Sequence, residues 1–213
     1  ALIMKLATTL LCEKGAGCGQ CLSCRQVAKL AHPDFLLLFP FPNLRPESRK
    51  HTLFHFSNPV SSSAKFSDET RDAVEEFKKQ KLEDPYFLPN YEKREIIPAE
   101  VVKDLIGSLA KKPLLGDRRV VGILDIEKMA YGGTDLFLKT VEEPPQNTHL
   151  LLTTSRPDQL YPTLLSRTQR IKIPLVPEEE VVTILSDKIG LDPSITLYLS
   201  RLGGGSPGLA ICL

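Results

Sequence analysis

Four short apolar runs along the chain match the pattern of buried β-strands. They cover residues 35–39, 118–126, 148–155 and 170–176. Runs of this length, rich in Leu, Ile and Val, are typical of parallel strands that helices cover on both faces. The pattern therefore predicts four strands, each separated from the next by other elements.

Apolar residues at helical spacing fill the intervals between these runs. A helix is expected in each of six segments, at residues 1–12, 25–31, 96–113, 132–145, 161–169 and 177–189. Pro144 and Pro145 should stop the helix of the fourth segment, because proline lacks an N–H donor and clashes with the preceding turn. Strand–helix alternation of this kind predicts an α/β fold with a parallel, doubly wound sheet.

The pattern breaks between residues 40 and 95, where prolines and a serine run surround a charged helical stretch at residues 68–84. We interpret residues 40–95 as an irregular insertion at the surface. The expected organisation is a core over residues 1–175 and an incomplete helical lid over residues 176–213.

Charge and hydropathy exclude several classes of protein. The net charge is +1, from 27 basic and 26 acidic residues, which argues against a nucleic-acid footprint over the whole surface but leaves a local basic patch open. No stretch approaches the roughly 18 apolar residues of a membrane helix. The apolar N-terminal stretch has no basic leader, so we expect no membrane contact and a cytoplasmic, reducing location.

Four of the five cysteines cluster in a Gly-rich knuckle at residues 12–24, with the spacing Cys-x5-Cys-x2-Cys-x2-Cys; they are Cys12, Cys18, Cys21 and Cys24. Four thiolates satisfy a tetrahedral zinc ion, and the intervening glycines allow the tight turns that such a site needs. A set of four cysteines leaves no open position, so the zinc would be structural. An iron–sulfur cluster and four free thiols are the alternatives.

Polar residues follow two of the apolar runs. Asp125 and Glu127 lie where residues 118–126 end, and Thr153 and Thr154 close the run at 148–155. A strand that ends in an acid, inside an α/β pattern, is where many nucleotide hydrolases hold magnesium. The alternative is a pair of solvated acids and ordinary strand-end threonines.

Several motifs together resemble the clamp-loader subunits of bacterial DNA polymerase III, which are of the AAA+ class. They are the cysteine knuckle, "HPDF", "DLFLKTVEEPP", "LLTTSRPDQLYPTLLSR" and "GGGSPGLA". The resemblance implies an AAA+ core of the P-loop type over residues 1–175. The family's phosphate loop lies ahead of the first helix, so we expect the core to be clipped at its front edge; no G-x4-G-K-[ST] occurs in the sequence.

The resemblance also implies that the nucleotide site is impaired. Counting back from "EEPP", the family's Asp-Glu pair falls on Leu124 and Asp125, while matching on "KM" puts it on Asp125 and Ile126. Either alignment removes one of the two acids, and an apolar side chain cannot neutralise Mg²⁺-phosphate charge. We therefore interpret Asp125, Glu127, Thr153 and Thr154 as remnants of a nucleotide site, and binding of ATP by this chain is not expected.

In the same family the arginine matching "TLLSRTQ" reaches into the ATP site of a neighbouring subunit. That position is Arg167, with Ser166 shaping the turn. The planar, permanently charged guanidinium suits developing phosphoryl charge. The alternative is an ordinary exposed arginine near a helix end.

The expected function is that of a non-hydrolysing clamp-loader subunit, which lends an arginine finger to a neighbouring ATPase while the sliding clamp is loaded onto primed DNA. Its partners would be the delta and tau/gamma subunits, the clamp and, through the complex, DNA. No independent catalysis is expected, although the chain would belong to the DNA-directed DNA polymerase (nucleotidyltransferase) holoenzyme. The alternatives are an ATP-hydrolysing tau/gamma-type motor subunit and a zinc-dependent nucleic-acid-binding module.

Overall fold

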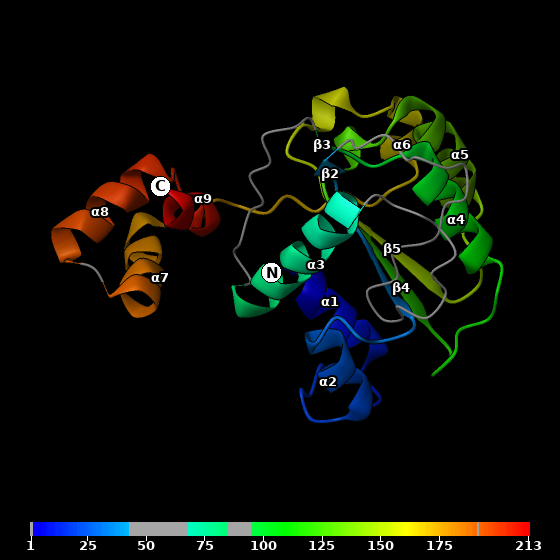
Figure 1. Ribbon diagram of the computed structural model, residues 1–213, viewed down its shortest axis with the longest axis horizontal. Helices are drawn as coiled ribbons and strands as arrows, with labels where there is room; N and C mark the ends of the chain where they lie inside the picture. The colour runs from blue at the N-terminus through cyan, green and yellow to red at the C-terminus, as the bar shows by residue number, and fades with distance from the viewer. Residues whose placement is uncertain (1, 43–67, 85–94, 191) are drawn as a thin grey trace. The chain divides into compact units, whose positions relative to one another are not determined.

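The computed structural model describes residues 2–42, 68–84, 95–190 and 192–213 (Figure 1). The helices are α1 (Leu2–Leu11), α2 (Leu22–Ala28), α3 (Asp68–Glu83), α4 (Ala99–Leu109), α5 (Tyr131–Glu142), α6 (Pro162–Ser166), α7 (Glu178–Ile189), α8 (Pro193–Leu202) and α9 (Pro207–Cys212). The strands are β1 (Phe35–Leu38), β2 (Phe41–Pro42), β3 (Glu95–Ile96), β4 (Arg119–Ile123) and β5 (Thr148–Leu152). In this described part of the chain, no helix has the length and apolar character needed to cross a bilayer.

Three parallel strands form the central sheet, in the order β1-β4-β5. Leu36 lies opposite Val121 in the register of the first pair, and Val121 lies opposite Leu150 in the second. All residues of β1 and β4 are buried, and helices flank the sheet, with α1 and α2 on one side and α4 and α5 on the other (Figure 1). The predicted parallel α/β fold is therefore confirmed.

The prediction of a strand over residues 170–176 is wrong. This segment has no regular secondary structure, and Ile171, Ile173 and Leu175 expose 71%, 60% and 72% of their surface. Its apolar residues alternate as in a strand, but a strand also needs a neighbour that pairs with its N–H and C=O groups. The segment pairs with none of the strands that the structure describes.

Two glycines let helices approach the sheet and each other closely. A Cβ atom at Gly122 of β4 would lie 2.9 Å from side-chain atoms of Ile3 in α1 and Leu37 in β1. A Cβ atom at Gly133 of α5 would lie 3.2 Å from the Cα atom of Ala99 in α4. Close packing of α1 on β4 and of α4 on α5 therefore depends on these two positions.

A buried ion pair joins Asp34, just before β1, to Arg119, the first residue of β4. The Asp34 carboxylate accepts hydrogen bonds from the backbone N–H groups of Leu114 and Leu115, both at 2.7 Å, and its Oδ1 lies 3.7 Å from Nη2 of Arg119. The Arg119 guanidinium donates to three carbonyl groups, those of Ser108, Lys111 and Lys112. The Asp of the "HPD" motif thus fixes a loop that is far from it in sequence.

The charged stretch predicted to be helical forms α3, and it contributes an aromatic contact to the fold. Phe77 of α3 is buried, and its ring stacks on that of Phe39 with centroids 3.8 Å apart. Most of the rest of the predicted insertion, residues 43–67 and 85–94, lies outside the described residues.

The chain divides into two compact units. One comprises Ala1–Lys78 with Tyr91–Gln169 and contains the parallel sheet; the other comprises Lys79–Asn90 with Arg170–Leu213. In the second unit, α7, α8 and α9 pack around a small apolar core formed by Val181, Leu185 and Ala210.

Candidate metal centre and strand-end site

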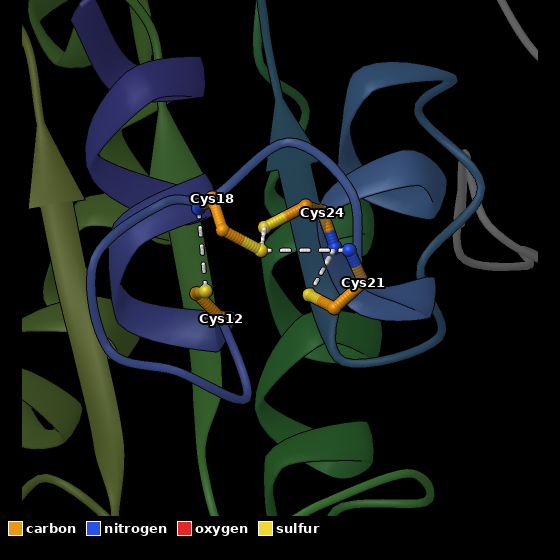
Figure 2. A group of neighbouring side chains, drawn as sticks. All are labelled: Cys12, Cys18, Cys21 and Cys24. Atoms are coloured by element: carbon orange, nitrogen blue, oxygen red, sulfur yellow. Dashed lines mark hydrogen bonds between the residues drawn. The ribbon is translucent and has the colours of Figure 1, made fainter.

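The four cysteines of the knuckle converge between α1 and α2 (Figure 2). One sulfur atom from each lies within 4.8 Å of all the others, and the Cys18 and Cys24 sulfur atoms are 4.0 Å apart. Four ligands at about 2.3 Å from a tetrahedral zinc ion would lie roughly 3.8 Å from each other. The observed spacing is close to this value, so the set could hold a metal ion.

Backbone turns bring the sulfur atoms together. Gly15, Gly17 and Gly19 have φ angles of +69°, +63° and +70°, a left-handed conformation that glycine adopts without strain. The sequence-based expectation that glycines make the turns of the knuckle is therefore confirmed. Cys21 then caps the N-terminus of α2, because its side chain accepts a hydrogen bond from the backbone N–H of Cys24.

Backbone N–H groups also point at the sulfur atoms and change their acidity. The N–H of Cys18 donates to the Cys12 sulfur at 3.4 Å, and this contact is the largest of those that lower the pKa of Cys12 to about 5. The N–H of Cys21 donates likewise to the Cys18 sulfur and lowers its pKa. Burial raises the pKa of Cys24 to about 12. N–H donors stabilise thiolates, which are the form that binds a metal.

The second group of predicted residues gathers where β4 and β5 end. Asp125 has a left-handed backbone, with φ +46° and ψ +58°. Its N–H donates to the Thr153 hydroxyl at 3.1 Å, and the N–H of Ile126 donates to the Thr153 carbonyl at 3.0 Å. Thr153 therefore holds the turn after β4, and the hydroxyl of this predicted nucleotide-site remnant has a structural partner. Thr154 lies next to it and accepts from the N–H of Arg156.

A lysine outside the predicted site residues lies beside Asp125. The Lys128 ammonium is 3.5 Å from the Asp125 carboxylate and also pairs with Glu95 of β3. Burial alone would lower the pKa of Lys128, but these two carboxylates outweigh burial and raise it. Asp125 thus already has a cation as its neighbour.

Glu127 points toward the loop after β5. Its Oε1 atom accepts from the backbone N–H and the hydroxyl of Ser155, at 3.1 and 3.0 Å. Burial would raise the pKa of Glu127, but hydrogen bonds from Thr154, Ser155 and its own backbone lower it below the usual value. Its Oε2 atom is buried without a hydrogen-bond partner among the described residues. The carboxylate therefore braces β4 against the loop after β5.

Arg167 follows the last turn of α6, and its side chain makes two polar contacts with described residues. Its Nη2 lies 3.3 Å from the Glu142 carboxylate at the end of α5, and its Nη1 donates to the Thr163 carbonyl at 3.5 Å. The side chains of Arg167 and Glu142 are each 42% exposed. The Ser166 hydroxyl also donates to the Thr163 carbonyl. Within the described residues, neither Arg167 nor Ser166 forms a hydrogen bond or ion pair with the strand-end group, which consists of Asp125, Glu127, Thr153 and Thr154.

Comparison with known proteins places this chain in a family. Residues 1–177 match the family described as DNA polymerase III, delta subunit. The chain belongs to this family. As a DNA polymerase III delta-type chain, it combines the parallel α/β fold with the predicted cysteine cluster.

Two curated relatives align with almost the whole chain. The DNA polymerase III subunit delta' of Escherichia coli is 27% identical over 216 residues, which is 100% of this chain and 50% of that protein. The subunit delta' of Pseudomonas aeruginosa is 27% identical over 211 residues, 97% of this chain and 49% of that protein. The chain thus spans about half the length of the curated relatives it matches.

A solved structure is also similar. The DNA polymerase III gamma subunit-related protein of Thermotoga maritima is 29% identical, with a TM-score of 0.39, over 55% of this chain and 41% of that protein.

Two ion pairs of this delta-type chain could not be seen in its sequence. Lys128 lies three residues after Asp125, a spacing that could have suggested a pair, but its contact with Glu95 depends on the fold. Glu142 and Arg167 are also far apart in sequence. Glu142 of "EEPP" thus has a basic partner within the chain, Arg167 at the C-cap of α6.

Proposed function

We propose that this chain is part of a non-hydrolysing, delta'-type subunit of a DNA polymerase III clamp loader. The subunit would assist a neighbouring ATPase while the sliding clamp is loaded onto primed DNA, in a cytoplasmic complex with delta and tau/gamma subunits. The observation that carries this proposal is the family match over residues 1–177.

Arg167 is the residue proposed to act on the neighbour's ATP. A finger must be accessible, and the Arg167 side chain is 42% exposed at the end of α6. The guanidinium keeps its charge at any physiological pH and can donate to two phosphate oxygens at once. Ser166 supports it by fixing the end of α6, since its hydroxyl donates to the Thr163 carbonyl.

The strand-end group is proposed to be a remnant that does not hold Mg²⁺-ATP. A magnesium ion would have to compete with the Lys128 ammonium for the carboxylate of Asp125. The side chain of Leu124, next to it, offers no oxygen ligand. Glu127 and Thr153 are occupied in holding the turn and the loop together.

The four cysteines are proposed to hold a structural zinc ion. The donor set consists of four thiol sulfur atoms within 4.8 Å of one another, which suits a closed tetrahedral site. The ion would fix the knuckle between α1 and α2, a segment with few apolar residues of its own. No catalytic role follows, because a site with four protein ligands leaves no position for a substrate.

Reconstitution with the full-length protein that contains this chain tests the proposal. Mixed with the delta and tau/gamma subunits, clamp and primed DNA, the protein should restore clamp loading that is absent without it. Alone, it should hydrolyse no more ATP than a buffer blank. ATP turnover by the protein alone would instead indicate a tau/gamma-type motor, and loading that proceeds equally well without the protein would contradict the proposal.

A further inference from the structure

The ion pair between Glu142 and Arg167 links the two motifs "EEPP" and "LLSR" at the ends of neighbouring helices. Glu142 is the last residue of α5, and Arg167 is the C-cap of α6. The carboxylate and the Nη2 nitrogen are 3.3 Å apart. This ion pair is separate from the strand-end group of Asp125, Glu127, Thr153 and Thr154. Its role therefore concerns the Arg167 guanidinium.

Glu142 is well placed to hold a long side chain in one position. Phe137 and Val141 anchor α5, with only 1% and 8% of their surface exposed. The backbone after Glu143 is restrained by Pro144 and Pro145, since a proline fixes its own φ angle and limits the residue before it. The carboxylate thus projects from the end of a helix that is fixed on both sides.

The contacts of Arg167 leave it able to donate to an outside acceptor. Glu142 engages Nη2 and the Thr163 carbonyl engages Nη1. Each of these nitrogens carries two N–H groups, and Nε carries a fifth. Two contacts at the terminal nitrogens therefore orient the guanidinium plane and still leave donors for phosphate oxygens.

We infer that Glu142 is a positioning residue for Arg167. It holds the guanidinium in one orientation before the neighbouring ATP site forms around it, so that less side-chain freedom is lost on docking. This inference rests on the proposed function, because it deepens the role given to Arg167. An exposed ion pair contributes modestly, so loss of the carboxylate should lower turnover by about two- to fivefold.

Steady-state ATP hydrolysis by the reconstituted clamp loader tests this inference. Glu142→Ala should lower kcat by about two- to fivefold and leave KM for ATP unchanged, because the carboxylate acts on the reacting geometry rather than on nucleotide affinity. Glu142→Gln keeps an acceptor oxygen without the charge, so its kcat should lie between those of wild type and Glu142→Ala. Glu143→Ala is the matched control, since this exposed neighbour forms no ion pair in the described structure, and it should behave as wild type.

The double variant Glu142→Ala/Arg167→Ala separates positioning from a general effect on folding. If Glu142 acts through Arg167, the double variant should turn over ATP as slowly as Arg167→Ala alone. The inference is overturned if Glu142→Ala matches Glu143→Ala, if it raises kcat, or if it lowers kcat further in the Arg167→Ala background. Unchanged turnover in Arg167→Ala would overturn the proposed finger itself, which is a distinct result.

Discussion

Asp34 and Arg119 form a buried ion pair in which Oδ1 lies 3.7 Å from Nη2, and neither side chain is more than 6% exposed. The pair also satisfies two N–H groups and two carbonyls of the loop between α4 and β4, and the Ser108 carbonyl in the last turn of α4. Removal of one partner from such a pair leaves an uncompensated charge in the interior, which destabilises a protein strongly. The pair therefore joins the start of β1 to the start of β4.

Asp34→Ala should lower the free energy of unfolding by roughly 3–5 kcal/mol, because Arg119 would lose its buried counter-charge. Urea unfolding followed by circular dichroism measures this loss. Asp117→Ala, at an exposed acid of the same loop, should change stability by no more than about 0.5 kcal/mol. Similar losses in the two variants would show that Asp34 does not hold the loop as described.

Gly133→Ala should lower stability by about 1–3 kcal/mol, because a Cβ atom would press on the Cα atom of Ala99 at 3.2 Å. The adjacent Gly132 is a matched control. A Cβ atom there would meet the nearest atom, Ala99 Cβ, at 3.8 Å, an ordinary contact. Gly132→Ala should leave stability unchanged or raise it slightly, since alanine favours helix. Thermal unfolding of both variants measures the difference. If the melting temperature of Gly133→Ala were as high as that of Gly132→Ala, the close packing of α4 on α5 would be contradicted.

Elemental analysis of the protein purified without added metal should find about one zinc ion per chain, bound by the four cysteines. Cys18→Ser should remove most of this zinc and lower the melting temperature, because the metal contributes to folding of the knuckle. Ser23→Ala, within the same knuckle, should retain both the zinc ion and the melting temperature of the wild type. Iron with visible absorption would support the iron–sulfur alternative, and full zinc content in Cys18→Ser would exclude Cys18 as a ligand.

Glu127 should make the free energy of unfolding depend on pH in the acidic range. Its pKa is lowered from 4.5 in the folded chain, so its contribution is present above about pH 4.5 and disappears as the pH falls through the folded value. The difference in unfolding free energy between wild type and Glu127→Gln should therefore be constant near neutral pH and shrink below about pH 4.5. Ser155→Ala, which loses the hydroxyl donor to Glu127 but keeps the backbone donor, should show a smaller pH dependence. A difference that stays constant down to pH 3 would contradict the bracing role.

The sequence predicted those features that depend on local pattern. Strands β1, β4 and β5 lie within three of the predicted apolar runs, and β1 and β4 are buried while β5 is half-buried. The cysteine cluster follows from short spacings with glycines between the ligands. The segment at residues 170–176 shows the limit of this reasoning, because alternation of apolar residues does not say whether a neighbouring strand is present to pair with it.

Contacts between residues distant in sequence could not be predicted. Asp34 meets Leu114 and Arg119 only because β1 lies beside β4 in the sheet. Glu142 meets Arg167 only because α5 and α6 end close together. Side-chain pairs of this kind leave no periodic pattern, and the bonds of Thr153 to the turn after β4 likewise depend on the register of two strands.

The most direct test of the account is ATP turnover by the reconstituted clamp loader with Arg167→Ala and Arg167→Lys in the full-length protein. Removal of a trans arginine finger lowers turnover by about 10³–10⁵ in well-studied phosphoryl-transfer enzymes. We predict that Arg167→Ala causes a large loss of ATP turnover at the neighbouring site that Arg167 serves. Arg167→Lys should restore little of this turnover, because an ammonium cannot match the planar guanidinium. Assembly and melting temperature should stay as in wild type. Unchanged turnover in an intact complex would contradict the claim that this chain supplies an arginine to its neighbour.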